Sequence, residues 1–134
     1  MMLRMALTAI AALAPAGAVQ ACALPGGGGE KVDSPRYELI YRAQPRKIPV
    51  SEYFSVELAV CAKGGAPAPE SVQVDAQMPA HRHGMNYKAS VKAQPGGYYR
   101  ADGLLFHMPG QWQFAFELRA GGRTERMTHD VIVE

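Results

Sequence analysis

The sequence predicts an all-β domain, an antiparallel β-sandwich of seven or eight short strands, and three observations support this prediction. Apolar and polar residues alternate with period two in successive runs along residues 36–134. Gly (14) and Pro (10), together with Asp, separate these runs at regular spacing. No stretch of that region keeps a helical apolar spacing for more than about one turn. Short, regularly spaced strands with turn residues between them are typical of a sandwich.

Eight apolar runs define the expected strands. Pro45, Gly64 and Pro95 lie in the turns that end three of them. Between the fifth and sixth runs, Asp102 and Gly103 indicate a turn or a bulge. In chain order, the runs are 37–41, 54–60, 71–78, 87–91, 98–101, 104–108, 112–118 and 127–133.

The predicted core contains the apolar residues that share one face of each run. A domain of this size can bury an adequate core without a disulfide or a metal. Trp112 is expected to pack against aliphatic side chains, because the inter-sheet disulfide of antibody domains is absent. The residues expected to point inward are Phe54, Val56, Leu58, Val72, Val74, Trp112, Phe114 and Phe116.

Residues 1–23 have the pattern of a secretory signal peptide. Arg4 is their only charge, and the alanine-rich apolar run that follows it is too short to cross a bilayer as a stable helix. Cleavage is expected either directly before Cys22, in a lipobox-like setting that would lipidate this cysteine, or, without a lipid, after Ala21 or Ala23. Both alternatives place the mature domain in the periplasm or elsewhere in the cell envelope.

Residues 24–35 are expected to be a flexible linker, because their run of glycines offers little surface to pack. The sandwich would then comprise residues 36–134. If Cys22 is lipidated or removed, Cys61 has no intramolecular partner. We therefore expect Cys61 to be a partly covered free thiol, with a metal-ligand role as the alternative.

Charge and motifs exclude several classes of function. Lys plus Arg is 14 and Asp plus Glu is 12, so the formal net charge of +2 provides no basic surface for nucleic acid. No Ser-His-Asp or Cys-His constellation and no phosphate-binding glycine loop can be identified in the sequence. We expect a protein that is not an enzyme, binds no nucleic acid and contacts a membrane only through a lipid on Cys22.

Histidine and methionine are concentrated in two segments of the domain. The first, MPAHRHGM, begins at Met78, and its proline and glycine predict a loop at a strand end. In an extended loop, His81 and His83 lie on the same side, where two imidazoles can bind one ion. Imidazole and thioether together suit copper, and the loop lacks the carboxylates that calcium and magnesium require.

The second segment is FHMPG, in which His107 points away from its apolar neighbours. Strands 71–78 and 104–108 both run into Met-Pro, so the two corners are neighbours if both strands end at the same edge. We therefore predict a copper site at one end of the sandwich. Its predicted ligands are His81, His83, Met85 and His107.

Each candidate ligand also has an explanation without a metal. Met78 and Met108 continue apolar strand faces, so core packing is the better explanation for both and they are the weaker candidates. His81 and His83 could be solvated loop residues. His129 lies on an apolar face and is expected to be a core histidine with a hydrogen-bond partner.

The block MPAHRHGMNY at 78–87, followed by GGYYRADGLLFHMPGQWQFAFEL at 96–118, resembles the YtkA-like and FixH-like domains of the cell envelope. These domains share a strand ending in Met-Pro, a His-x-His-Gly-Met loop and a Phe-His-Met-Pro-Gly segment before a strand with Trp. The resemblance implies an immunoglobulin-like sandwich exposed to the periplasm. It also implies a role in handling copper or in assembling copper-containing respiratory proteins.

Together, these observations favour an exported protein that binds or delivers copper through its His/Met cluster. The expected partner is a copper-containing envelope protein. The alternative is a metal-free module that binds another envelope protein or a small ligand.

Overall fold

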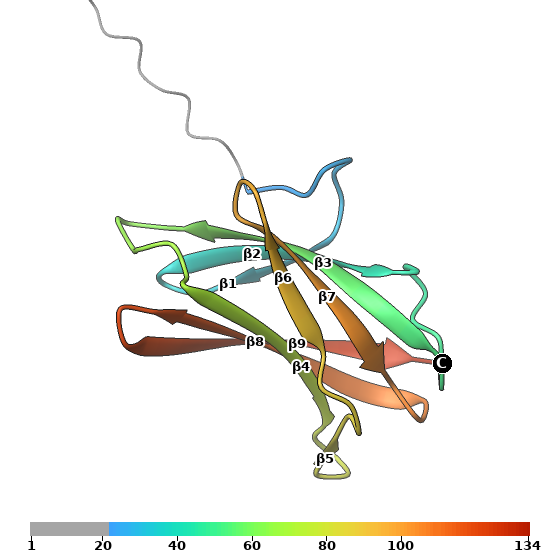
Figure 1. Cartoon of the computed structure of the whole chain (residues 1–134). Helices are drawn as coiled ribbons and strands as arrows, with labels where there is room; N and C mark the ends of the chain where they lie inside the picture. The colour runs from blue at the N-terminus through green and yellow to red at the C-terminus, as the bar shows by residue number, and fades with distance from the viewer. Residues whose placement is uncertain (1–21) are drawn as a thin grey trace, which may run out of the picture.

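A computed structural model describes residues 22–134, which form two antiparallel sheets packed face to face as a β-sandwich (Figure 1). The predicted fold class is therefore confirmed. The first sheet has the order β1 (Glu30–Asp33), β2 (Tyr37–Gln44), β3 (Tyr53–Ala62), β7 (Tyr98–Leu105) and β6 (Ser90–Gln94). The second has the order β5 (His83–Gly84), β4 (Ser71–Met78), β8 (Gly110–Ala120) and β9 (Arg123–Val133). Within residues 22–134, no helix is long and apolar enough to span a membrane.

The core lies between the sheets, and all eight residues expected to point inward are buried there. The predicted environment of Trp112 is wrong in one respect. Its indole stacks on the ring of Phe106, with centroids 4.2 Å apart and planes 1° from parallel. Phe106 follows β7 and is fully buried, so Trp112 packs against an aromatic ring and not against aliphatic side chains alone.

Strand β7 runs without interruption through the position where the sequence indicates a turn or a bulge, and the bulge is the correct alternative. Phe54 pairs with Leu104 and Val56 with Ala101, which leaves Ser55 facing Asp102 and Gly103 together. Gly103 has a φ of 84°, a left-handed conformation that glycine adopts without strain. The runs 98–101 and 104–108 therefore belong mostly to one strand.

The segment expected to be a flexible linker is ordered. Residues 30–33 form β1, which pairs with β2 and buries Val32. Before it, the side chain of Leu24 is only 4% exposed. The expectation of a linker over 24–35 is wrong because Leu24 finds an apolar partner surface on the outer face of the first sheet.

Cys61 is not a free thiol, because it forms a disulfide with Cys22. Cys61 was expected to lack a partner on the assumption that Cys22 is lipidated or removed. The pairing needs Cys22 in the chain with a sulfur that carries no other group. The predicted signal peptide, residues 1–23, lies outside the described residues except for its last two.

Candidate metal centre

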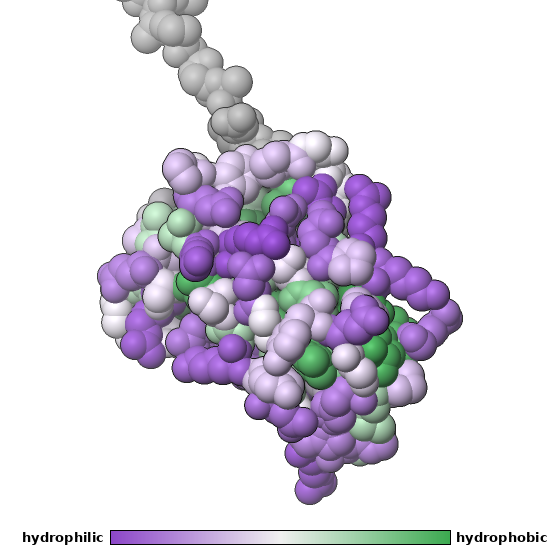
Figure 2. All heavy atoms as spheres, turned by 45° about the vertical axis from the view of Figure 1, so that its right-hand side comes forward, coloured by the Kyte–Doolittle hydropathy of each residue, from purple (hydrophilic) through white to green (hydrophobic). Residues whose placement is uncertain are grey.

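The first histidine segment forms a β-hairpin. Met78 pairs with His83 across β4 and β5, and the backbone N–H of His81 donates to the carbonyl of Met78 (3.1 Å). Arg82 has a φ of 51°, in the left-handed region, as the tight turn requires. The expected extended loop is therefore a hairpin turn, which projects from one end of the sandwich with a hydrophilic surface (Figure 2). The rings of His81 and His83 are still neighbours, with centroids 5.6 Å apart.

The second segment is the connection that carries the chain from β7 in one sheet to β8 in the other. The carbonyl of Phe106 accepts a hydrogen bond from the N–H of Ser51 (2.8 Å), and the carbonyl of Met108 accepts one from the indole N–H of Trp112 (3.0 Å). These bonds fix the backbone on both sides of His107. Its side chain is half-buried, and its Nδ1 atom is buried with no hydrogen-bond partner.

The two Met-Pro corners are neighbours, as predicted, although β4 and β7 belong to different sheets and meet at one end of the sandwich instead of at one sheet edge. A Cβ on Gly110 would lie 2.9 Å from Cε of Met78, so the second corner sits directly against the first. The rings of His83 and His107 have centroids 5.1 Å apart. The fold therefore brings His81, His83 and His107 into one row, with His83 in the middle.

The distances between neighbouring ring centroids in this row, 5.6 and 5.1 Å, are short enough for the histidines to share an ion. With metal–nitrogen bonds of ~2.0–2.1 Å, two imidazoles on one metal have ring centroids about 5–6 Å apart. The rings of His81 and His83 are, however, stacked, with planes 20° from parallel. In line with this, residues 22–134 contain no group of three or more His, Cys, Asp or Glu side chains arranged to hold a metal ion. The imidazoles have the spacing for a shared ion, but the described side chains are not arranged to hold one.

The rings of the two hairpin histidines are free to rotate. His81 and His83 are exposed, and the outer torsion of a histidine side chain has a broad, shallow energy profile. His107 has less room to rotate, because its ring is half-buried and packs edge-on against the indole of Trp112, with centroids 5.4 Å apart. The row thus has one half-buried imidazole and two exposed ones.

The methionines differ in how far they can contribute. Met78 is 1% exposed and belongs to the core, as its strand pattern predicts. Met85 and Met108 are half-buried and pack against the core from the same end of the sandwich. Met85 follows Gly84 directly and its N–H donates to the carbonyl of Ala76 (3.3 Å), which holds it beside the hairpin.

The family described as YtkA-like matches residues 30–117 of the sequence. The chain belongs to the YtkA-like family. The match includes all four predicted ligands. No curated protein matches the chain. Among solved structures, the crystal structure of a DUF4426 family protein from Pseudomonas aeruginosa PAO1 is similar, with a TM-score of 0.49 and 13% identity. That alignment covers 78% of this chain and 99% of the other.

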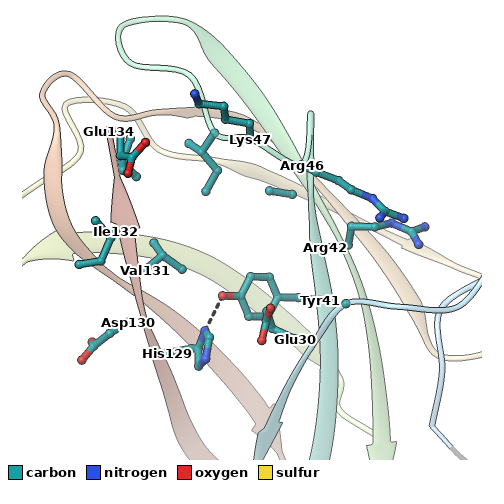
Figure 3. A pocket seen from close by; sticks show the side chains of 14 residues that line it. Glu30, Tyr41, Arg42, Arg46, Lys47, His129, Asp130, Val131, Ile132 and Glu134 are labelled. Carbon is teal, nitrogen blue, oxygen red and sulfur yellow. Dashed lines mark hydrogen bonds between the residues drawn. The ribbon is translucent and has the colours of Figure 1, made fainter.

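The remaining histidine of the sandwich, His129, lies outside the residues matched by the YtkA-like family and apart from the row. It is on edge strand β9, and β8 separates it from β4. Its Nδ1 forms a 2.6 Å hydrogen bond with the hydroxyl of Tyr41 (Figure 3). Burial raises the pKa of Tyr41 well above its usual value, and the negative charge of Glu30 raises it further. The expectation that His129 has a partner is therefore confirmed, although the ring is only half-buried.

Tyr41 and His129 border a cavity of about 690 Å³ at the open side of the sandwich. Its walls combine apolar side chains such as Ile48 and Val131 with charged residues at the rim, among them Lys47 (Figure 3). The volume is within the range of small-molecule sites in proteins. The sequence pattern gave no sign of this cavity, because β2, the 45–49 loop and β9 form it together and only the fold brings them into contact.

Proposed function

We propose that this YtkA-like protein is exported to the cell envelope and binds or delivers copper through His81, His83, His107 and Met85. The observation that carries the proposal is the row of three imidazoles, contributed by segments more than twenty residues apart. The donor set favours copper because it combines imidazole with thioether. The segment 78–85 contains no carboxylate, which disfavours calcium and magnesium.

The unpartnered nitrogen of His107 adds a second reason. A buried polar atom without a hydrogen bond costs about 1–3 kcal/mol. Nδ1 of His107 is such an atom, and the ring of His83 lies next to that of His107, with centroids 5.1 Å apart. A metal bound by this row through Nδ1 of His107 would give that atom its missing partner. We propose a binding role and not catalysis.

Export to the envelope rests on two independent features. Residues 1–23 have the charge and apolar pattern of a secretory signal peptide. Cys22 and Cys61 form a disulfide, a bond that persists in oxidising compartments and is rare in the cytosol. The delivery partner that we propose is a copper-containing envelope protein.

Copper titration of the purified protein tests the proposal, with the fluorescence of Trp112 as the signal. Trp112 is the single tryptophan and its ring lies 5.4 Å from that of His107, so copper in the row is expected to quench it. The wild type should bind one Cu(I) in competition with a chelator. His81→Ala combined with His83→Ala should lose at least the ~10–100-fold in affinity that the loss of a supporting residue already costs.

The matched control is His129→Gln, which changes a histidine of the same domain outside the row. It should leave the copper affinity unchanged. Equal affinities for the wild type and the double variant would contradict the proposal. They would favour the metal-free module instead, with the cavity beside Tyr41 and His129 as its ligand site.

A further inference from the structure

Residues 22–29, which we call the strap, cross the outer face of the first sheet. Leu24 inserts its side chain against Ile40 of β2 and Ala59 of β3, where it forms a small second core. Tyr98 of β7 packs against the edge of this cluster. The strap is therefore part of the fold and is not a tether that leads away from it.

Polar contacts hold the strap along its length. The guanidinium of Arg42 donates to the carbonyl of Gly27 (2.7 Å) and to that of Pro25 (3.2 Å). The same group is fixed on the sheet by an ion pair with Glu57 (2.9 Å). At the end of the strap, a Cβ on Gly29 would lie 2.8 Å from the carbonyl oxygen of Tyr41. The backbone of the strap thus lies close against β2.

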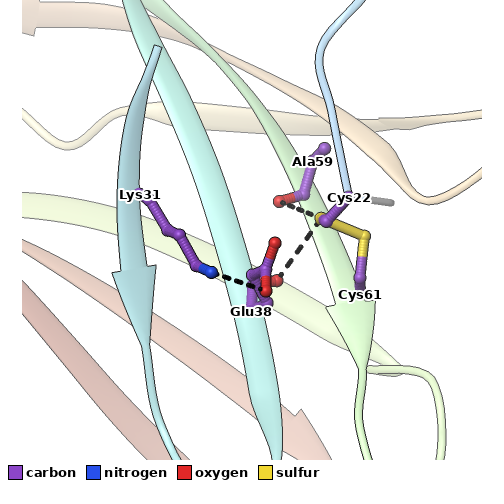
Figure 4. Close-up of a disulfide and its surroundings, with 5 residues drawn as sticks. All are labelled: Cys22, Lys31, Glu38, Ala59 and Cys61. Carbon is purple, nitrogen blue, oxygen red and sulfur yellow. Dashed lines mark hydrogen bonds and ion pairs between the residues drawn. A yellow bond between two sulfur atoms is a disulfide. The ribbon is translucent and has the colours of Figure 1, made fainter. Parts of the chain in front are cut away.

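The disulfide joins the start of the strap to β3 (Figure 4). The Cα atoms of Cys22 and Cys61 are 5.9 Å apart, a usual separation for a disulfide. Sγ of Cys22 lies 3.7 Å from the carbonyl oxygen of Glu38, so the sulfur rests on the backbone of β2. Leu24 and Arg42 place Cys22 here by contacts that do not involve sulfur.

We infer that Cys22 is retained in the mature protein as half of a structural disulfide, that it carries no lipid, and that signal cleavage follows Ala21. A sulfur atom bonded to a diacylglyceryl group cannot also bond to Cys61, so lipidation and the disulfide exclude each other. Cleavage after Ala23 would remove Cys22 altogether. Among the expected processing routes, only unlipidated cleavage after Ala21 leaves the thiol that the fold uses.

The chemistry of the pairing is thiol–disulfide exchange. One cysteine thiolate attacks the disulfide of an oxidised thiol–disulfide carrier in the envelope and releases one of its sulfurs as a thiol. The other cysteine thiolate then attacks the mixed disulfide at the protein's sulfur and releases the second. Two cysteine thiols become one disulfide, and the carrier disulfide becomes two thiols. This inference rests on the proposed export, because the carrier belongs to an oxidising compartment.

Mass spectrometry of the full chain, expressed in cells and recovered from their envelope fraction, tests the inference. The expected protein begins at Cys22, is lighter by two hydrogen atoms than its reduced form, and takes no alkylating reagent before reduction and two equivalents after it. A diacylglyceryl group on Cys22, an intact Met1, or a Cys61 that alkylates without reduction would overturn it. A start at any other residue would overturn the cleavage assignment.

Two serine variants provide a matched comparison. If the two cysteines are disulfide partners, Cys22→Ser and Cys61→Ser should both remain in the aqueous phase on detergent partition and should show the same drop in unfolding midpoint. If Cys22 is a lipid acceptor, only Cys22→Ser should leave the detergent phase, and Cys61→Ser should have normal stability. Neither variant alters the histidine row, so a failure of the copper proposal would appear in the copper titration alone.

Discussion

His107 and His129 are both half-buried, but they differ in their hydrogen bonding. His129 bonds to Tyr41, 88 residues away in sequence, whereas Nδ1 of His107 has no partner among the described residues. The strand pattern placed His129 on an apolar face and His107 opposite one, which was enough to suggest different roles. It could not identify Tyr41 as the partner, because a contact between β2 and β9 depends on how the two sheets are aligned.

Replacing Tyr41 with Phe should lower the free energy of unfolding at neutral pH. It should also change how this free energy varies with pH in the alkaline range. The loss of the bond to His129 should cost about 1 kcal/mol. Burial raises the pKa of Tyr41 in the folded state, whereas the unfolded chain loses this proton near ~pH 10. Below that pH the contribution of Tyr41 to stability is fully present, and above it the contribution falls as pH rises.

Urea unfolding of the wild type and Tyr41→Phe between neutral and strongly alkaline pH measures this effect. The deficit of the variant should shrink as pH rises above ~10, because the phenylalanine has no proton to lose. A deficit that stays constant across the range would show that Tyr41 ionises equally well in both states.

At the scale of elements, strands with strict alternation of apolar and polar residues were predicted with accurate bounds. The expected run 71–78 coincides with β4, because every second residue of that strand is buried. Strand β1 was missed because it buries only Val32 and so carries no visible period. The strap was missed because glycine-rich composition usually indicates flexibility. Its packing comes from Leu24 and Arg42, which contact a surface formed by two strands distant in sequence.

In the candidate site, too, the sequence predicted some features, and others depend on the fold. The shared Met-Pro ends of two strands predicted that the hairpin and the β7–β8 connection would meet, and the rings of His83 and His107 do lie 5.1 Å apart. The near-parallel orientation of His81 and His83 could not be predicted, because it depends on the hairpin turn at Arg82 and on side-chain torsions.

Alanine at Gly29 should destabilise the domain more than alanine at Gly28. Gly29 has a φ of 100° and Gly28 a φ of 73°, so both variants carry backbone strain. Only at Gly29 would the new Cβ meet neighbouring atoms, 2.8 Å from the carbonyl oxygen of Tyr41 and 2.9 Å from Ile40. Overpacking of this kind typically costs about 1–3 kcal/mol. Denaturant midpoints of the two variants give the difference, and equal midpoints would show that the strap does not press on β2.

At the scale of the whole molecule, the histidine row connects the two sheets. His83 belongs to the second sheet, and His107 follows the last strand residue of β7 in the first sheet. An ion held by both would therefore restrain the sheets relative to each other at this end. Copper that binds only the folded chain stabilises it according to its affinity and concentration.

Thermal unfolding should thus depend on copper in the wild type. At a free concentration one hundred times Kd, the expected gain is about 2.7 kcal/mol. With Cys22 and Cys61 paired, the unfolded chain offers no thiol that would reduce this gain. The gain should disappear on acidification, because a protonated imidazole has no lone pair to donate. It should also be absent when His81 and His83 are both alanine, and a copper-induced rise in Tm for that variant would place the ion elsewhere.

The disulfide and the histidine row lie at opposite ends of β3. Cys61 is near the last residue of that strand, and Tyr53, its first residue, pairs with Leu105, two residues before His107. A strand of ten residues spans about 33 Å. The domain therefore has two chemically different ends, one with the disulfide and one with the histidine row. A support, a purification tag or a neighbouring domain joined ahead of Cys22 would occupy one pole and leave the histidine pole facing outward, where a second protein can approach it unobstructed.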